Sequence, residues 1–98
     1  MRTANPPRLY LDDLRVGDRF TSGEHALDAA QIVAFARQFD PQPFHTDPEE
    51  AEHTFFHGLA ASGWHTAALT MKLLVESGIP LADGIIGSGG ELAWPQPT

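Results

Sequence analysis

The sequence predicts a small α+β domain in which one helix is buried inside a sheet. Residues 63–75 are apolar around almost the whole circumference of a helix, and such a helix has to be covered on every side. Residues 28–40 carry a one-sided apolar stripe with helical spacing, while residues 19–27 and 83–94 resemble strands. Two strands cannot wrap a helix, so we expect the sheet to be incomplete in this chain.

Composition narrows the class of protein. A chain of 98 residues supports one domain with a modest core. Thirteen acidic side chains against six basic ones, a net charge of −7, argue against binding to nucleic acid, which needs clustered Lys and Arg. The absence of cysteine excludes disulfides, thiolate zinc sites and a cysteine nucleophile.

The same residues argue against export and membrane insertion. Residues 1–14 carry prolines and aspartates where a secretory signal would have an apolar core. No apolar run approaches the roughly 20 residues that a bilayer requires. We therefore expect a cytoplasmic protein without a membrane partner.

The first half of the chain contains one strand and one helix after a loose lead-in over residues 1–8. A turn at residues 16–18 precedes Phe20 and Thr21, which suit the strand 19–27. Asp28 is a good N-cap for the next helix, and the prolines at 41 and 43 end that helix near Asp40. The stripe of this helix consists of Ile32, Phe35, Ala36 and Phe39.

The second half contains a short helix, the apolar helix and a glycine-rich strand. Asp47, followed by Pro48 and two glutamates, predicts a short helix that ends at about His53. Gly78 and Pro80 end the helix that starts at residue 63. In the strand 83–94, Leu92 and Trp94 share a face, and the glycines predict that this backbone lies close to the helix or to a ligand; they are Gly87, Gly89 and Gly90.

Asp40 and His45 are the best candidates for acid/base chemistry. They lie five positions apart on a segment stiffened by Pro41 and Pro43, and a rigid segment can aim both side chains at one point. The alternative is that Asp40 forms a turn and His45 merely precedes the next helix. Short matches of this kind are common by chance, so the pair alone does not decide between the two interpretations.

Gly63 is the candidate for stabilising negative charge. It opens the apolar helix, where free N–H groups and the helix dipole favour an oxyanion, and it has no side chain to block approach. The alternative is that the small residues at this helix entry serve packing only. Ser62 lacks the glycine-flanked context of a nucleophilic serine, so we interpret it as an N-cap.

Two longer motifs resemble a known family. The run from Phe39 to Asp47 (FDPQPFHTD) and the run from Gly58 to Thr66 (GLAASGWHT) are similar to the MaoC-like dehydratases and (R)-specific enoyl-CoA hydratases. The resemblance includes residues 10–20 and 87–97, and the spacing between the two motifs agrees as well. It implies a hot-dog fold, in which a curved antiparallel sheet wraps one long central helix. It also implies that residues 1–98 form the N-terminal part of one such domain.

The resemblance assigns roles to individual residues. The catalytic Asp and His of the family correspond to Asp40 and His45, and the glycine that holds the thioester oxygen corresponds to Gly63. It implies syn addition of water to a trans-2-enoyl thioester of coenzyme A or an acyl carrier, or the reverse, in fatty acid metabolism. No bound cofactor is implied, because coenzyme A is part of the substrate. The pocket candidates beside these motifs are Phe44, Ser62 and Trp64.

The chain departs from the family in two respects. Gln42-Pro43 stands where many members have Asn-Pro, and Ser62-Gly63-Trp64 stands where many have His-Gly-Met; neither change removes the candidate pair. Members usually continue for several strands beyond the segment that matches residues 91–97. This shortage favours an alternative, a non-catalytic acyl-thioester-binding or structural subunit completed by a partner chain.

Two further alternatives are weaker. A hot-dog thioesterase would share the fold but not the Asp-x4-His loop. His53 and His57 have the i, i+4 spacing of metal ligands, but Thr54 stands where a zinc protease has its Glu, so we expect no metal. Because two strands leave apolar surface of the helix exposed, and such surface favours association, we expect a homodimer or a hetero-oligomer.

Overall fold

In the computed structural model, which describes residues 8–98, helix α1 (Ala29–Phe39) begins and ends as predicted. The Asp28 side chain accepts a hydrogen bond from the N–H of Gln31 (2.8 Å), and the Gln31 side chain accepts one from the N–H of Asp28 (3.4 Å). This reciprocal cap satisfies two N–H groups of the first turn. The N–H of Asp40 bonds to the carbonyl of Ala36 (2.8 Å), and Pro41 then prevents continuation.

Two one-turn helices follow, α2 (Pro43–Thr46) and α3 (Pro48–Ala51). Each begins with a proline, whose fixed φ suits the first helical position and whose missing N–H costs nothing there. Asp47 caps α3 by accepting hydrogen bonds from the N–H groups of Glu49 (3.0 Å) and Glu50 (3.3 Å). The predicted short helix is confirmed, although it ends at Ala51. Helix α2 was not predicted, since the two prolines suggested a rigid loop.

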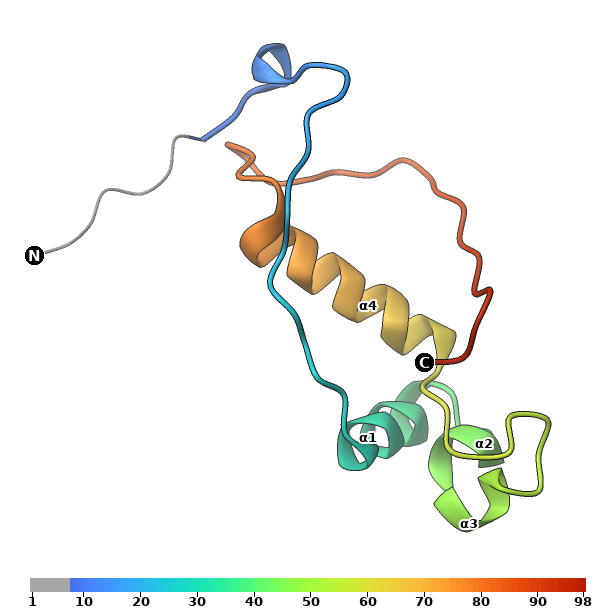
Figure 1. The fold of residues 1–98 in the computed structure, drawn as a ribbon. Coiled ribbons are helices and arrows are strands. Elements are labelled where there is room, and N and C mark those ends of the chain that lie inside the picture. Colours follow the sequence, from blue (N-terminus) through green and yellow to red (C-terminus); the bar gives the residue numbers. More distant parts are fainter. Residues whose placement is uncertain (1–7) are drawn as a thin grey trace, which may run out of the picture.

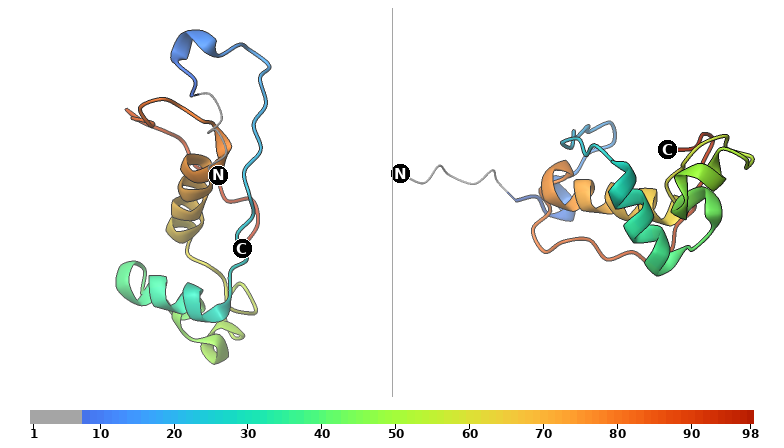
Figure 2. Two further views of the ribbon diagram at one scale, coloured as in Figure 1. Left: turned by 90° about the vertical axis from the view of Figure 1, so that its left-hand side faces the viewer. Right: turned by 90° about the horizontal axis from the view of Figure 1, so that it is seen from below.

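Helix α4 (Gly63–Leu73) is the long axis of the molecule, and a π-helical turn (Leu74–Gly78) continues it. Figure 1 shows α1, α2 and α3 gathered at the end where α4 begins, and both views in Figure 2 agree. Within α4 only His65 is buried, whereas Trp64 and Met71 are exposed. The expectation that this helix is enclosed is therefore not met by residues 8–98. None of their helices is long and apolar enough to cross a membrane.

The strands predicted for residues 19–27 and 83–94 are extended segments without sheet pairing. A single parallel bridge between Leu9 and Leu81 is the only strand-like pairing among residues 8–98. The reason is geometric: a strand exists only beside another strand, and these two segments run along different sides of α4 (Figure 1). The described residues thus form helices and extended segments, with no sheet beyond this single bridge.

The expected close approach of the glycine-rich segment to the helix is not found at its three glycines. A methyl group added at Gly87, Gly89 or Gly90 would meet no atom within 4 Å. These positions lie where the segment bows away from α4 (Figure 1). The segment returns to the helix only near its end, where Trp94 packs on Gly63.

The core lies where the four helices meet, and it is built from small residues. Its buried apolar members are Ile32, Ala36, Ala51, Ala60 and Ala61. Small side chains allow the backbones of α1, α2 and the entry to α4 to approach closely. The predicted lead-in over residues 1–8 lies, except for Arg8, outside the described residues.

Candidate active site

Asp40 and His45 are brought together by the tight connection between α1 and α2. Asp40 is the last residue held by α1, and its carbonyl accepts the N–H of Gln42 (2.8 Å), which turns the chain into α2. His45 lies on the single turn of α2. As a result, the Oδ2 atom of Asp40 is 3.4 Å from the Nε2 atom of His45. The predicted pair is therefore a spatial pair.

The backbone of the α4 entry fixes the ring of His45. The Nδ1 atom of His45 lies 2.6 Å from the carbonyl oxygen of Ala60, and the N–H of Ala60 donates to the carbonyl of Phe44 (3.0 Å). A carbonyl oxygen can only accept, so we assign the proton of neutral His45 to Nδ1. The Nε2 atom that faces Asp40 then carries a lone pair. His45 itself is only 6% exposed, so the ring has little freedom to turn.

Both oxygens of the Asp40 carboxylate are hydrogen-bonded. The hydroxyl of Ser62 donates to Oδ2 (2.7 Å), and the side-chain amide of Gln42 donates to Oδ1 (2.6 Å). Burial raises the pKa of Asp40, but these two hydrogen bonds and the neighbouring His45 outweigh it, so the pKa lies below its ordinary value of 3.8. Asp40 is therefore a carboxylate at neutral pH.

Aromatic side chains pack around the His45 ring. Phe44 meets it edge to face with ring centroids 4.6 Å apart, and Phe56 lies at 6.4 Å. Phe44 and Phe56 also contact one another in a T-shaped arrangement at 5.2 Å. These rings shield the imidazole from water on one side and leave the Nε2 side facing Asp40.

A cavity of about 340 Å³ opens in front of the pair. Four of the predicted site residues line this cavity, where a bound molecule could contact them: Asp40, His45, Gly63 and Trp64. The remaining lining residues are Phe55, Phe56, Ala60, Ala61, Thr66 and residues 94–98. Phe44 and Ser62 are not among the lining residues: Phe44 contacts His45, and Ser62 contacts Asp40.

Gly63 stands at the first position of α4, directly after the N-cap Ser62. N–H groups of a first helical turn have no partner inside the helix and carry the positive end of its dipole. The glycine is also required for packing, because a Cβ atom here would lie 2.7 Å from the indole of Trp94. Trp94 and Trp64 meet edge to face at 5.9 Å and form one wall of the cavity.

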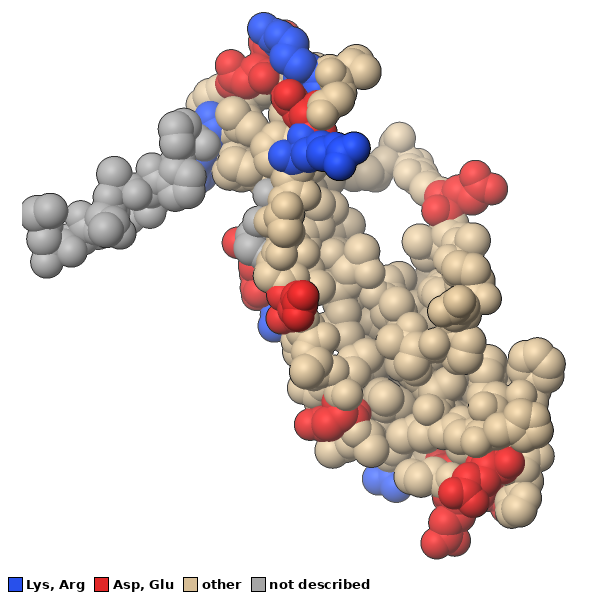
Figure 3. Space-filling view, in the orientation of Figure 1, with Lys and Arg blue, Asp and Glu red and all other residues tan. Residues whose placement is uncertain are grey.

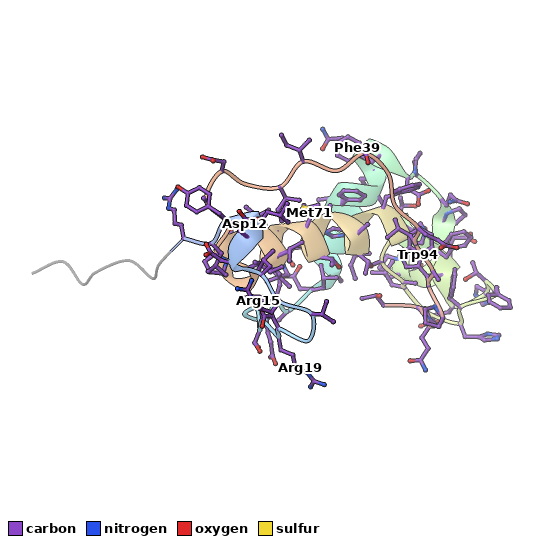
Figure 4. The ribbon with its side chains drawn as sticks, turned by 90° about the horizontal axis from the view of Figure 1, so that it is seen from above. Asp12, Arg15, Arg19, Phe39, Met71 and Trp94 are labelled. Carbon is purple, nitrogen blue, oxygen red and sulfur yellow. The ribbon has the colours of Figure 1, made fainter. Side chains whose placement is uncertain are left out.

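Charge is distributed unevenly along the molecule. Figure 3 shows acidic side chains at both ends of the molecule, whereas most basic ones lie at the end near the 3-10 turn Leu11–Asp13, away from α2 and α3. In Figure 4, Arg15 and Arg19 lie far from Trp94 and the cavity. No Lys or Arg lines the cavity among the residues that the structure describes.

A metal site is not formed by the described part of the chain. No group of three or more His, Cys, Asp or Glu side chains within residues 8–98 could hold an ion. The spacing of His53 and His57 therefore does not correspond to a ligand cluster in these residues.

Several site residues were not identified from the sequence. The carbonyl of Ala60 orients His45, and Phe56 and Trp94 line the cavity. Ser62 was identified as a cap and a pocket candidate, but its hydrogen bond to Asp40 was not predicted. The small residues of the run 58–63 could have indicated these contacts, because small side chains allow the backbone to approach neighbouring groups closely. Asp40 and His45 also serve as the C-cap of α1 and as part of α2, and both line the same cavity.

Comparison with known proteins gives a consistent result. A family model described as "MaoC like domain" matches residues 15–86. The crystal structure of the MaoC-like dehydratase from Rhodospirillum rubrum is 68% identical in sequence and superposes with a TM-score of 0.89, covering 92% of this chain and 62% of that chain.

The protein YdeM of Bacillus subtilis (strain 168), which is described as uncharacterized, is 37% identical over 80 residues, 82% of this chain and 57% of YdeM. The chain thus spans about three fifths of the length of the proteins it matches. The family resemblance of the two motifs is confirmed. This chain belongs to the family of MaoC-like domains.

Proposed function

We propose that the chain acts as a hydratase or dehydratase on a trans-2-enoyl or 3-hydroxyacyl thioester. The observation that carries the proposal is the Asp40–His45 pair, whose Oδ2 and Nε2 atoms lie 3.4 Å apart and whose two residues line the same cavity as Gly63. Membership of the MaoC-like family supports a reaction of this kind. The acyl group would be carried by coenzyme A or by an acyl carrier, with no resident cofactor.

The protonation states suggest how a water molecule would be held. Oδ2 of Asp40 and Nε2 of neutral His45 are both acceptors, so one water can donate a hydrogen bond to each of them. Its oxygen then keeps a lone pair for attack.

Hydration then follows in two balanced steps. The water oxygen bonds to Cβ of the enoyl group while one water proton passes to the Asp40–His45 pair. The π electrons move toward the thioester oxygen, where the N–H of Gly63 stabilises the enolate-like charge. The protonated pair returns its proton to Cα on the same face, and the carbonyl re-forms. Dehydration is the same sequence reversed.

The sheet and the assembly belong to the same proposal. The chain forms the N-terminal part of a single MaoC-like domain, in which residues 19–27 and 83–94 are strands of a curved antiparallel sheet around α4. The high TM-score over 92% of this chain supports that placement. Further strands complete the cover of α4, and the working unit is a homodimer or a hetero-oligomer in the cytoplasm.

Exposure of α4 favours a second candidate, an acyl-thioester-binding or structural subunit without turnover. The two candidates differ in a simple assay. Purified chain is mixed with crotonyl-CoA, and the loss of enoyl absorbance is followed beside an Asp40→Asn control. Hydration by the wild type alone supports the enzyme. Binding of crotonyl-CoA without turnover supports the subunit, and release of free thiol indicates a thioesterase.

A further inference from the structure

We propose that Ser62 is a positioning residue that orients the Asp40 carboxylate toward His45 from the helix that carries Gly63. The proposal rests on the function proposed above for Asp40, and it assigns to Ser62 a task that helix capping does not include. Its effect on the reaction would pass entirely through Asp40, because Ser62 is not among the residues that line the cavity.

The hydroxyl of Ser62 performs two separate tasks at once. Its single hydrogen is donated to Oδ2 of Asp40 (2.7 Å), and an oxygen lone pair accepts the N–H of Trp64 (3.3 Å). A hydroxyl has one donor hydrogen and two acceptor lone pairs, so the tasks do not compete. The shorter bond goes to the charged partner, and hydrogen bonds to ionised groups are the stronger class. Capping alone would leave the hydrogen free to point elsewhere.

Ser62 is the dominant of the two donors on Asp40. Gln42 is exposed and only two residues away, so water can replace its amide on Oδ1. Ser62 is 0% exposed and 22 residues away, so its hydroxyl is held in place on Oδ2 by the surrounding fold. Oδ2 is also the oxygen that faces His45. Ser62 therefore determines the direction of the remaining lone pair on that atom.

The same bond fixes the distance between the two halves of the site. Asp40 follows the last residue of α1, and Ser62 precedes the first residue of α4. Their bond holds the end of α1 against the start of α4, and thus the acid/base pair against Gly63. A displacement of about 1 Å in such a site lowers the rate about 10²-fold. Loss of this bond should therefore lower turnover.

Variants of Ser62 separate positioning from capping. Ser62→Gly removes the hydroxyl but leaves a residue that is itself tolerated at an N-cap. Ser62→Ala removes both contributions, and Ser62→Thr restores the hydroxyl. Asp28→Ala is the matched control, because it removes the cap of α1 without touching the site. Thermal melts give the folded fraction of each variant.

The first measurement is hydration of crotonyl-CoA per folded molecule. We expect Ser62→Gly and Ser62→Ala to lower kcat by about 10- to 100-fold while KM changes by less than about threefold, since a positioning residue acts on the reacting group and not on binding. Ser62→Thr should recover most of the loss. Asp28→Ala should retain the kcat of the wild type. Equal kcat in Ser62→Gly and the wild type would overturn the proposal.

The second measurement does not require turnover. The Ser62 hydroxyl is one of the groups that lower the pKa of Asp40, so carbon-13 NMR of the Asp40 carboxyl should show that its pKa rises in Ser62→Gly and not in Asp28→Ala. An unchanged pKa refutes the anchoring. A wild type that titrates as expected but hydrates nothing contradicts the proposed function, and the NMR result still decides whether Ser62 orients the carboxylate.

Discussion

At the scale of single residues, the site depends on which atoms can donate a proton. The carbonyl of Ala60 can only accept, and this holds the proton of neutral His45 on the nitrogen remote from Asp40. Ser62 and Gln42 can both donate to Asp40, and this favours its charged form. The pair is thus set with two acceptor atoms facing each other. In the proposed mechanism, one water molecule donates a hydrogen bond to each of these two atoms.

Asp40→Asn should lower hydration of crotonyl-CoA by about 10² to 10⁴-fold, the usual contribution of an acid/base group. The fold should survive. The Asn oxygen can accept from Ser62, and the exposed Gln42 amide can turn to accept from the new NH₂ group. Stopped-flow or steady-state absorbance measures the rate. Asp47→Asn, which alters only the cap of α3, serves as the control and should retain full activity.

The double variant Asp40→Asn/His45→Ala should hydrate crotonyl-CoA only slightly more slowly than either single variant. If both groups act on the same water molecule, removal of either one already abolishes that step, so the losses in activity are not additive. The same absorbance assay on the double variant measures this. If the two losses multiplied, the residues would be acting in separate steps, and the shared-water mechanism would be wrong.

Gly63→Val should abolish most of the activity while the helices remain. The added side chain meets the indole of Trp94, which is half exposed and can swing aside at modest cost in stability, but it also covers the N–H proposed to hold the thioester oxygen. Rates and thermal melts on the same samples test this. Gly58→Ala is the control, since a Cβ atom there meets open space. If stability and activity fell in proportion, Gly63 would matter only for packing.

The sequence was most informative about individual residues whose role is local. Asp28, Asp47 and Ser62 were identified as caps because a cap depends on the next three residues only. The interpretation of Ser62 was nevertheless incomplete. Its second partner, Asp40, is 22 residues away, and no local rule predicts such a contact.

At the scale of elements, α1 and α4 are joined by an aromatic stack that includes a titratable ring. His65 of α4 lies parallel to Phe35 of α1, with ring centroids 4.4 Å apart and an angle of 6°. Its Nδ1 atom is buried without a hydrogen-bond partner among the described residues. Burial lowers the pKa of His65, and the positive charge of His25 lowers it further. The packing of the two helices is therefore favourable with a neutral imidazole.

The stability of the protein should consequently fall on mild acidification. Unfolded His65 titrates near 6.5, and the folded protein binds this proton only at lower pH, so the unfolded state holds more protons between the two values. The contribution to the free energy of unfolding is constant above about pH 6.5. It decreases as the pH falls to the lowered pKa and then levels off.

Urea denaturation of the wild type and of His65→Phe across this range gives the measurement. Phenylalanine keeps the stack on Phe35 but does not titrate, so the stability of His65→Phe should depend less on pH between neutrality and mild acid. Asp40 contributes in a separate window, because its lowered pKa makes its stabilisation disappear only below about pH 3.8. Parallel pH profiles for the two proteins would contradict the role of His65.

The elements that were predicted well are the ones whose formation is local. The limits of α1 and α4 follow from caps, prolines and apolar spacing, all of which lie within the segment itself. The strands 19–27 and 83–94 could not be verified in the same way, because a strand depends on a partner elsewhere. The one-turn helix α2 was missed since two prolines fit a rigid loop as well as a helical start.

At the scale of the whole molecule, the described chain is extended for its length. Its radius of gyration is 17.3 Å, against about 13 Å for a compact domain of this size. The excess comes from α4 and from two extended segments that form no sheet within residues 8–98 (Figure 2). Large apolar side chains on these parts are exposed, among them Met71, Val75, Ile86 and Leu92.

The chain should therefore not be a stable monomer. Exposed backbone edges and apolar side chains favour association with a second copy or with a strand-bearing partner. Sedimentation at low micromolar concentration should show an oligomer, or aggregation where no suitable partner is present. A monodisperse monomer with a sharp cooperative melt would show that α4 is sufficiently covered within one chain.

A charge placed on the extended segment 83–94 should weaken that association. Ile86 is almost fully exposed, so Ile86→Lys replaces an apolar contact with a charge of a kind that protects natural strand edges. Ser88→Lys makes the same change in charge two residues away without removing an apolar side chain. Sedimentation of both variants should show a lower association constant for Ile86→Lys alone. Equal behaviour would exclude this segment from the interface.

Family membership, unlike the covering sheet, was within reach of the sequence. Two motifs at a fixed spacing identify a MaoC-like domain, because both contribute residues to the same cavity. Whatever covers α4 is not specified by residues 8–98. The apolar residues around that helix predict only that it is buried, not which residues bury it.

The edge-to-face contact of Trp64 and Trp94 provides the molecule with an optical reporter. These are the only two tryptophans in the sequence, and their rings are 5.9 Å apart at the mouth of the cavity. Two indoles at this separation couple their electronic transitions and give a paired circular-dichroism signal that neither ring produces alone. Any event that lifts the 94–98 segment from the first turn of α4, whether the arrival of an acyl group or of another strand, should extinguish that signal. Occupancy could thus be followed without a label.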